Sequence, residues 1–239
     1  MTRRTTLAAA AALAAAPATL RAQATPPAAP AERPLFGAKQ WQLPNGLRVV
    51  LAENRRAPVV AQYLFYAAGG GEDPAGRSGV AHFLEHMMFK GSPNVASGEF
   101  SRRVAREGGN DNAFTSRDVT AYFQQVEASR LPLVMRMEAD RFAAALIPAD
   151  QVESERNVVL EERRQRTDSS ARARFQEAFR AALWGPQTWP GRPIIGWEHE
   201  IRAITRDDLV AFYDRFYAPH NATLVVSGAV DEATLRALA

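Results

Sequence analysis

Apolar and polar residues follow the strand period in four parts of the chain. Residues 59–68 form a nearly continuous apolar run closed by three glycines, which is typical of a buried strand. Residues 120–126 alternate with a period of two, and residues 222–227 are also predicted to form a strand. Asn45 and Gly46 stand between two apolar segments and are a strong two-residue signal for a β-hairpin.

Other segments follow the helical period. The predicted helices span residues 78–90, 97–107, 129–145, 149–166 and 170–183, and two more begin at Thr205 and Asp231. Between them, residues 185–200 are rich in Pro, Gly and Trp, which predicts a loop. Because strands and helices are mixed and an antiparallel hairpin comes early, the pattern indicates an α+β fold rather than a doubly wound parallel sheet.

The first 24 residues have the three parts of a secretory signal. A basic start at Arg3 and Arg4 precedes an apolar run over residues 7–20, and small residues surround an expected cleavage site after Ala24. An Ala-rich membrane helix is the alternative, but the run is too short to span a bilayer and contains Pro17. The paired arginines also resemble a twin-arginine signal. We therefore expect an exported protein, periplasmic or secreted, with no membrane segment in its mature form.

Composition narrows the possible chemistry. The 239 residues suffice for one large domain or two small ones, and residues 25–34 form a Pro/Ala-rich linker that is expected to be extended or disordered. The net charge is +3, but the first 24 residues hold three of the 29 basic residues and no acid, which leaves 26 basic against 26 acidic side chains. No basic patch remains, so nucleic-acid binding is disfavoured. The absence of cysteine excludes disulfides, thiolate nucleophiles and Cys-ligated metal.

The segment His-Phe-Leu-Glu-His carries the candidate chemistry. His82 and His86 are four residues apart in a predicted helix, so both imidazoles can bind one ion. A catalytic zinc takes three protein ligands and leaves a position for a water whose pKa it lowers toward about 7. Glu85 projects near the same site and can take the proton of that water and deliver it to a leaving amine. The His-x-x-Glu-His order is the inverted zinc-protease motif; two ordinary core or surface histidines are the alternative.

A third ligand has to come from elsewhere in the sequence. His199 and His220 lie in or next to predicted loops, so a carboxylate is the natural candidate. The predicted helix 149–166 offers four: Glu153, Glu155, Glu161 and Glu162. Glu155 and Glu162 are seven residues apart on one face, whereas Glu161 is rotated by about 100°. Taken alone, these acids are better explained as a solvated face that pairs with neighbouring arginines.

A series of motifs extends beyond this helix. In chain order they are HFLEHMMFKGS, GGNDNAFTSRDVTAYF (108–123), RMEADRF (136–142), ERNVVLEE (155–162), GRPIIGW (191–197) and FYAPHNATLVVSGAV (216–230). From about Leu35 to its end, the sequence thereby resembles the pitrilysin/insulinase family of zinc metallopeptidases, in particular the branch of mitochondrial processing peptidase and its bacterial homologues. The resemblance implies a mixed, largely antiparallel sheet packed against helices, in a half-chamber domain like those of LuxS and mitochondrial processing peptidase.

The resemblance also implies roles for individual residues. It assigns the binding of one Zn²⁺ per chain to three ligands, His82, His86 and Glu162, and the role of general base to Glu85. Glu155 matches a second acidic position that supports the site, since a buried carboxylate often orients a ligand histidine. Asn112 and Ala113 match an edge strand on which the family pairs an extended peptide substrate.

The same resemblance implies a partner. The family's peptidases enclose their substrate between this domain and a second, homologous domain, so residues 35–239 are expected to be the N-terminal, zinc-bearing half. We expect a zinc endopeptidase that cleaves extended or unfolded oligopeptides. One alternative is a zinc-binding half that is inactive until a second half closes over it, and another is a non-catalytic scaffold subunit. Scaffold members usually lose motif residues, whereas all four key positions are present here.

Overall fold

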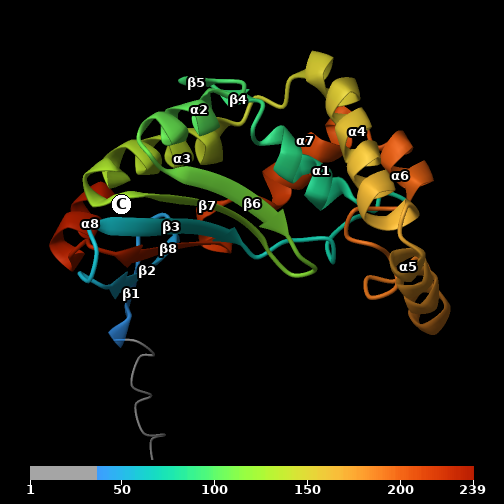
Figure 1. Cartoon of the computed structure of the whole chain (residues 1–239), viewed down its shortest axis with the longest axis horizontal. Helices are drawn as coiled ribbons and strands as arrows, with labels where there is room; N and C mark the ends of the chain where they lie inside the picture. Colours follow the sequence, from blue (N-terminus) through green and yellow to red (C-terminus); the bar gives the residue numbers. More distant parts are fainter. Residues whose placement is uncertain (1–36) are drawn as a thin grey trace, which may run out of the picture. The chain divides into compact units, whose positions relative to one another are not determined.

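A six-stranded sheet runs through residues 37–239, the part of the protein that the computed structural model describes (Figure 1). The predicted signal over residues 1–24 and the linker over residues 25–34 lie outside this part. The strands are β1 (Lys39–Gln42), β2 (Arg48–Glu53), β3 (Val59–Tyr66), β6 (Asn110–Thr115), β7 (Thr120–Glu127) and β8 (Ala222–Gly228). Their order is β1-β2-β8-β3-β7-β6, and every neighbouring pair is antiparallel except β2 and β8. The mixed, largely antiparallel sheet confirms the expected α+β fold.

Two of the strand predictions follow directly from local chemistry. β1 and β2 form the predicted hairpin, and Gly46 at its turn has a φ of 93°, which a residue without a side chain adopts readily. In β3, buried and partly exposed residues alternate along the strand, as a period of two requires. Gln62 interrupts the apolar face of β3. Its amide nitrogen donates a hydrogen bond to Oε1 of Gln124 in β7 at 3.0 Å, whereas its own buried Oε1 has no partner among the described residues.

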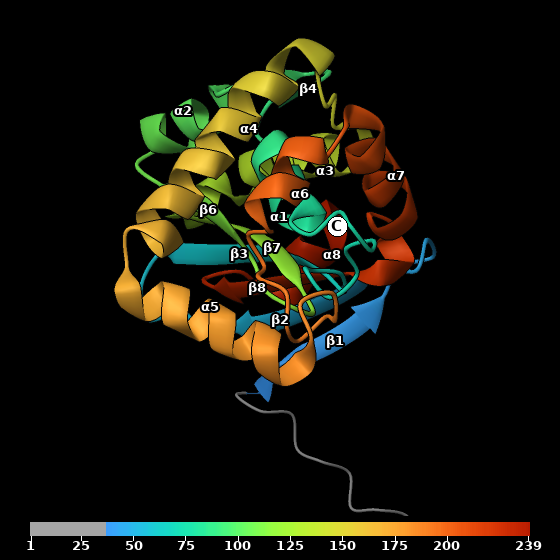
Figure 2. The same cartoon turned by 90° about the vertical axis from the view of Figure 1, so that its right-hand side faces the viewer.

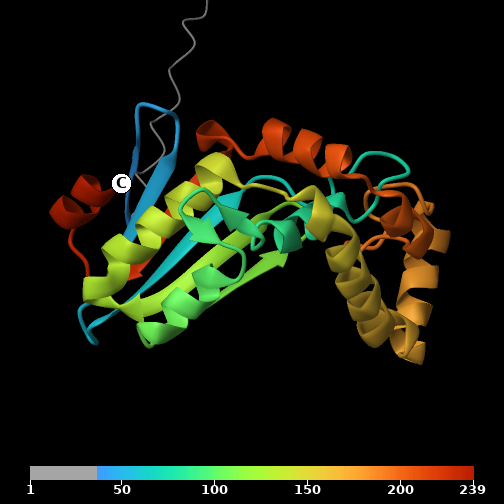
Figure 3. The ribbon, with the colours of Figure 1, turned by 90° about the horizontal axis from the view of Figure 1, so that it is seen from above.

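The helices cover one face of the sheet and one end of it. They are α1 (Val80–Met87), α2 (Glu99–Arg106), α3 (Leu131–Ala144), α4 (Ala149–Arg163), α5 (Ala171–Trp184), α6 (Glu198–Ala203), α7 (Arg206–Phe216) and α8 (Glu232–Leu238). Figure 1 shows α2 and α3 above the sheet, and Figure 3 shows α4, α5 and α6 at the end of the molecule opposite α8. Within residues 37–239, no helix combines the length and the apolar composition needed to cross a bilayer.

Several elements differ from the predictions. The helix expected over residues 149–166 ends as an α-helix at Arg163 and continues as a π-helix, η3 (Arg164–Asp168). The short α6 begins inside the predicted loop 185–200, and a small hairpin, β4 (Gly91–Ser92) with β5 (Val95–Ala96), had no periodic signal. Short elements of this kind depend on tertiary contacts more than on periodicity, which is why the sequence pattern missed them.

Candidate metal centre

Helix α1, which carries the His-x-x-Glu-His segment, lies in the middle of the molecule. Figure 2 shows it behind α6 and between α4 and α7. Phe83, Leu84 and Met87 are completely buried and belong to the main hydrophobic core. The apolar residues of the segment therefore fix the helix in the core, and this packing sets the direction in which the histidines point.

The N-terminus of α1 is held by a buried carboxylate. Asp73 accepts hydrogen bonds from the backbone N–H groups of Gly79 and Ala81, at 2.7 and 2.8 Å. Negative charge at a helix N-terminus is favourable, because it satisfies N–H groups that have no partner within the helix. Gly79 has a φ of 92°, and a Cβ at this position would meet the carbonyl oxygen of Ile195 at 2.5 Å. The start of α1 is thus fixed by a carboxylate on one side and by close backbone packing on the other.

Asp73 gives a pH-dependent contribution to stability that can be measured. Burial raises its pKa to about 7, even though both backbone N–H groups oppose the rise. Between about pH 4 and pH 7 the folded protein therefore binds a proton that the unfolded chain does not, so this contribution is present below about pH 4 and is lost as the pH rises through 7. We expect the free energy of unfolding of the wild type to fall relative to that of Asp73→Asn over this range, as measured by urea denaturation at constant salt.

The control for this measurement is Asp208→Asn. Despite partial burial, hydrogen bonds from Thr205 lower the pKa of Asp208 below its usual value of 3.8. Its titration therefore falls below the tested range, and its curve should run parallel to that of the wild type. Parallel curves for Asp73→Asn as well would show that Asp73 does not titrate in this window.

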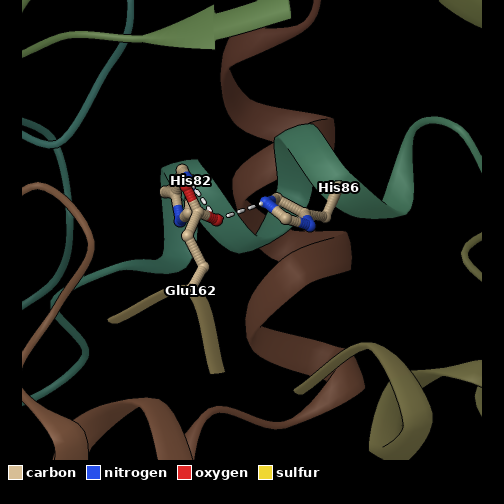
Figure 4. A group of neighbouring side chains, drawn as sticks. All are labelled: His82, His86 and Glu162. Atoms are coloured by element: carbon tan, nitrogen blue, oxygen red, sulfur yellow. Dashed lines mark ion pairs between the residues drawn. The ribbon is translucent and has the colours of Figure 1, made fainter. Parts of the chain in front are cut away.

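Three possible metal ligands converge between α1 and α4. The Oε2 atom of Glu162 lies 3.5 Å from Nε2 of His82 and 3.2 Å from Nε2 of His86 (Figure 4). One donor atom from each of the three residues lies within 4.8 Å of the others. Ligand atoms about 2.1 Å from a tetrahedral zinc are separated by about 3.4 Å. The observed spacing and the two-nitrogen, one-oxygen donor set therefore fit a zinc ion.

The electrostatics of the three residues also suit a cation. Burial and the neighbouring His86 together lower the pKa of His82 to about 4, although Glu162 opposes them, so His82 is neutral at pH 7. Burial would also lower the pKa of His86, but its hydrogen bonds to Glu155 and Glu162 outweigh burial and raise the pKa to about 9. The hydrogen bond from His86 lowers the pKa of Glu162 in turn. Two carboxylates thus favour positive charge at this place, which a divalent cation supplies when it binds.

Glu155 holds His86 from the other side of the ring. Its Oε1 atom lies 2.8 Å from Nδ1 of His86 and accepts the proton of that nitrogen, so Nε2 is the ring atom that faces Glu162 and is free to bind a metal once it loses its own proton. The second oxygen of Glu155 pairs with the ammonium of Lys90. Although burial opposes it, these partners lower the pKa of Glu155, so it is ionised at pH 7. Glu155 therefore has the geometry of a residue that orients a metal ligand.

Glu85 is not one of the three donors, and its carboxylate bonds to the sheet. Thr115, the last residue of β6, donates a hydrogen bond from Oγ1 to Oε2 of Glu85 at 2.5 Å. Burial raises the pKa of Glu85, and this hydrogen bond opposes the rise. Since β6 is an edge strand and ends at Thr115, this contact places an edge of the sheet beside the carboxylate. Asn112 and Ala113 occupy this edge strand, and their binding of a peptide stays a prediction.

Among the candidates for the third donor, the structure separates Glu162 from its neighbours. Glu161 pairs with Arg164 and Glu153 pairs with Arg156, and both glutamate side chains are exposed. His199 is exposed, and His220 follows α7 next to the turn at Gly46. The sequence reasoning missed three supporting residues, Asp73, Lys90 and Thr115. Lys90 lies in the HFLEHMMFKGS motif and Thr115 in the GGNDNAFTSRDVTAYF motif, but no sequence spacing links Lys90 to Glu155 or Thr115 to Glu85.

A mixed sheet that holds an inverted His-x-x-Glu-His helix opposite a distant glutamate defines a class of zinc metallopeptidase domains. The chain belongs to the insulinase family, peptidase family M16. The sequence profile described as Insulinase (Peptidase family M16) matches residues 48–194, and one described as Peptidase M16 inactive domain matches residues 203–239. The predicted family is thereby confirmed.

Proteins of similar sequence are named zinc proteases. An uncharacterized zinc protease of Mycobacterium tuberculosis is 36% identical over 218 residues, which are 91% of this chain and 48% of that protein. The zinc protease PqqE of Helicobacter pylori is 36% identical over 193 residues, 79% of this chain and 43% of that protein. The chain thus spans about half the length of the curated relatives it matches.

Solved structures show the same fold. A protease from Helicobacter pylori superposes with a TM-score of 0.79 at 32% identity, over 84% of this chain and 48% of that one. The first half of the periplasmic protease PqqL from Escherichia coli gives a TM-score of 0.76 at 30% identity, over 84% of this chain and 44% of that one. The described residues therefore have the fold of one half of an M16 protease.

Proposed function

We propose that this chain is the zinc-bearing half of an endopeptidase that hydrolyses peptide bonds in extended or unfolded oligopeptides. The observation that carries the proposal is the convergence of His82, His86 and Glu162 beside Glu85, at the end of an edge strand. Zinc as the metal is supported by the donor set and by relatives that are named zinc proteases.

Each residue of the site has a separate role in the proposed reaction. His82, His86 and Glu162 hold the zinc, which, when bound, supplies Lewis-acid polarisation of the reacting oxygens. Glu85 takes a proton from the attacking water and passes it to the leaving amine, so its carboxylate is restored after each cycle. Thr115 fixes the Oε2 atom of Glu85, and Glu155 fixes the ring of His86.

The substrate binds along β6 in this proposal. An extended peptide pairs with the edge of β6 at Asn112 and Ala113 through backbone hydrogen bonds, and its carbonyl oxygen replaces Oδ1 of Asn112, to which the N–H of Ala113 donates at 2.8 Å in this structure. Because β6 ends at Thr115, a peptide in this register leads directly to Glu85. This arrangement predicts a preference for extended chains over folded proteins.

A second candidate is that this half is inactive until a homologous half covers it. The observation that favours it is the outer face of α5, where no residue is buried. Phe175 and Phe179 are 68% and 56% exposed and stack on each other, and Leu183 and Trp184 continue the apolar face. Exposed apolar surface of this kind marks a protein interaction site. A non-catalytic scaffold remains the third candidate.

The N-terminal sequence supports a proposal for the cellular location of the protein. We propose that residues 1–24 are a signal peptide, that residues 25–34 are a linker and that residues 35–239 are the zinc domain of an exported protein. The structural relative PqqL of Escherichia coli is a periplasmic protease, which supports this proposal.

The three candidates predict different results in one assay. We expect the purified chain to bind about one zinc by metal analysis, and to cleave a quenched fluorescent peptide when a homologous second half is added. Phe175→Ser with Phe179→Ser should weaken this rescue and leave zinc binding unchanged. Cleavage without any partner would contradict the dependence on a second half. Zinc binding without cleavage in any mixture would favour the scaffold, and absence of zinc binding would contradict the first two candidates.

A further inference from the structure

The two oxygens of Glu162 have different partners. Oε2 faces the Nε2 atoms of both histidines, whereas Oε1 lies 2.8 Å from Nη1 of Arg166. A carboxylate with two free oxygens can bind a metal through one or both of them. Here a guanidinium holds one oxygen away from the place where the donors converge.

Arg166 is placed for this contact by the backbone that follows the ligand. It lies four residues after Glu162, at the point where α4 has given way to the π-helix η3. π-Helical turns are rare and occur frequently at functional sites. The preceding Arg163 is buried and bonds to Glu177 of α5 and to the carbonyl oxygen of Gly196, which anchors the end of α4. The segment that presents Arg166 is therefore tied to two other parts of the fold.

An ordinary surface ion pair is the simpler explanation for this contact. Arg164 and Glu161 provide an example, since both side chains are exposed and neither contacts the donors. Arg166 is also exposed, at 76%, so its pair differs in the acidic partner: the side chain of Glu162 is only 18% exposed and its other oxygen faces both imidazoles. Arg166 makes no other ion pair or hydrogen bond to residues 37–239.

We propose that Arg166 is a positioning residue that restricts Glu162 to one metal-binding oxygen. This inference rests on the proposed zinc site. With Oε1 held by Arg166, Glu162 occupies one coordination position and leaves another open, as a catalytic zinc site requires. Without Arg166, the carboxylate can turn and bind through both oxygens, which fills the open position.

Three variants separate the hydrogen bond of Arg166 from its charge. Arg166→Met removes both, Arg166→Lys keeps both, and Arg166→Gln keeps a donor without charge. The coordination number can be read from the visible spectrum of the protein loaded with Co²⁺, because the absorption bands weaken as coordination number rises. We expect weakened bands for Arg166→Met and wild-type bands for Arg166→Lys and Arg166→Gln. In the active assembly, kcat of Arg166→Met should fall about 10–100-fold with little change in KM.

The matched control is Arg164→Met, which breaks the neighbouring exposed pair and should change neither the spectrum nor kcat. If Arg166→Met keeps the wild-type cobalt spectrum, or if Arg166→Gln behaves like Arg166→Met, the inference is wrong. Thermal unfolding of each variant checks that the fold is intact. If the wild type binds neither zinc nor cobalt, both the proposed function and this inference are wrong. If the cobalt spectrum of Arg166→Met is altered but the wild type cleaves no peptide, the inference holds and the proposed function is wrong.

Discussion

Replacing Glu85 with Gln is expected to abolish most peptidase activity while the protein keeps about one zinc per chain. Gln has nearly the same shape, but its amide cannot take a proton from water. Loss of a general base lowers the rate by about 10²–10⁴-fold. Glu85 lies outside the group of converging donors, so zinc binding should not depend on it. The measurements are kcat/KM on a quenched peptide, in the assembly that cleaves it, and zinc content by metal analysis.

The control is Glu198→Gln, which changes an exposed carboxylate on α6 that pairs with Arg202. This variant should keep full activity and full zinc content. Equal cleavage by Glu85→Gln and the wild type would show that another group acts as the base. Loss of zinc from Glu85→Gln would instead place this residue among the ligands.

The second large effect is expected at Glu162. Its replacement by Gln exchanges an anionic oxygen for a weak neutral donor, and the two imidazoles alone cannot complete a zinc site. Loss of an outer partner of a ligand costs about 10–100-fold in affinity, and loss of the ligand itself should cost more. We therefore expect zinc affinity, measured by competition with a chelator, to fall by more than about 100-fold.

Glu161→Gln is a closely matched control for this variant. Glu161 is the preceding residue on the same helix, but its side chain is 47% exposed and pairs with Arg164. Zinc affinity should not change in Glu161→Gln. Equal affinities for both variants would contradict the role of Glu162, and a loss confined to Glu161→Gln would show that the wrong carboxylate was chosen.

Much of the fold was open to prediction because its signals are local. The hairpin at Asn45 and Gly46, the buried strand β3 and the main helices each follow from a few neighbouring residues. Helix ends differed from the predicted ones by a few residues, since capping and fraying depend on surrounding contacts. The π-helix after Arg163 left no signal in the periodic pattern.

In the candidate site, too, some features were predictable from local spacing and others were not. His82 and His86 share a helical face because of their spacing alone, so the sequence predicts that they can bind one ion. Glu162 was one of four acids on a helix, and spacing within that helix did not distinguish it from Glu155. Only the packing of α4 against α1 places Glu162 at Nε2 of both histidines and Glu155 at Nδ1 of His86.

By itself, the sequence determined the family, the fold class and the pair of imidazoles on one helix, because local periodicity and ordered motifs carry that information. Tertiary structure decided the parallel pairing of β2 with β8, the contact between Thr115 and Glu85 and the different partners of the two oxygens of Glu162. The first two of these join residues far apart in the chain, and the third depends on how α4 packs against α1. These three contacts form because burial of apolar faces packs the elements against each other, and residue spacing within one element does not predict which other element it contacts.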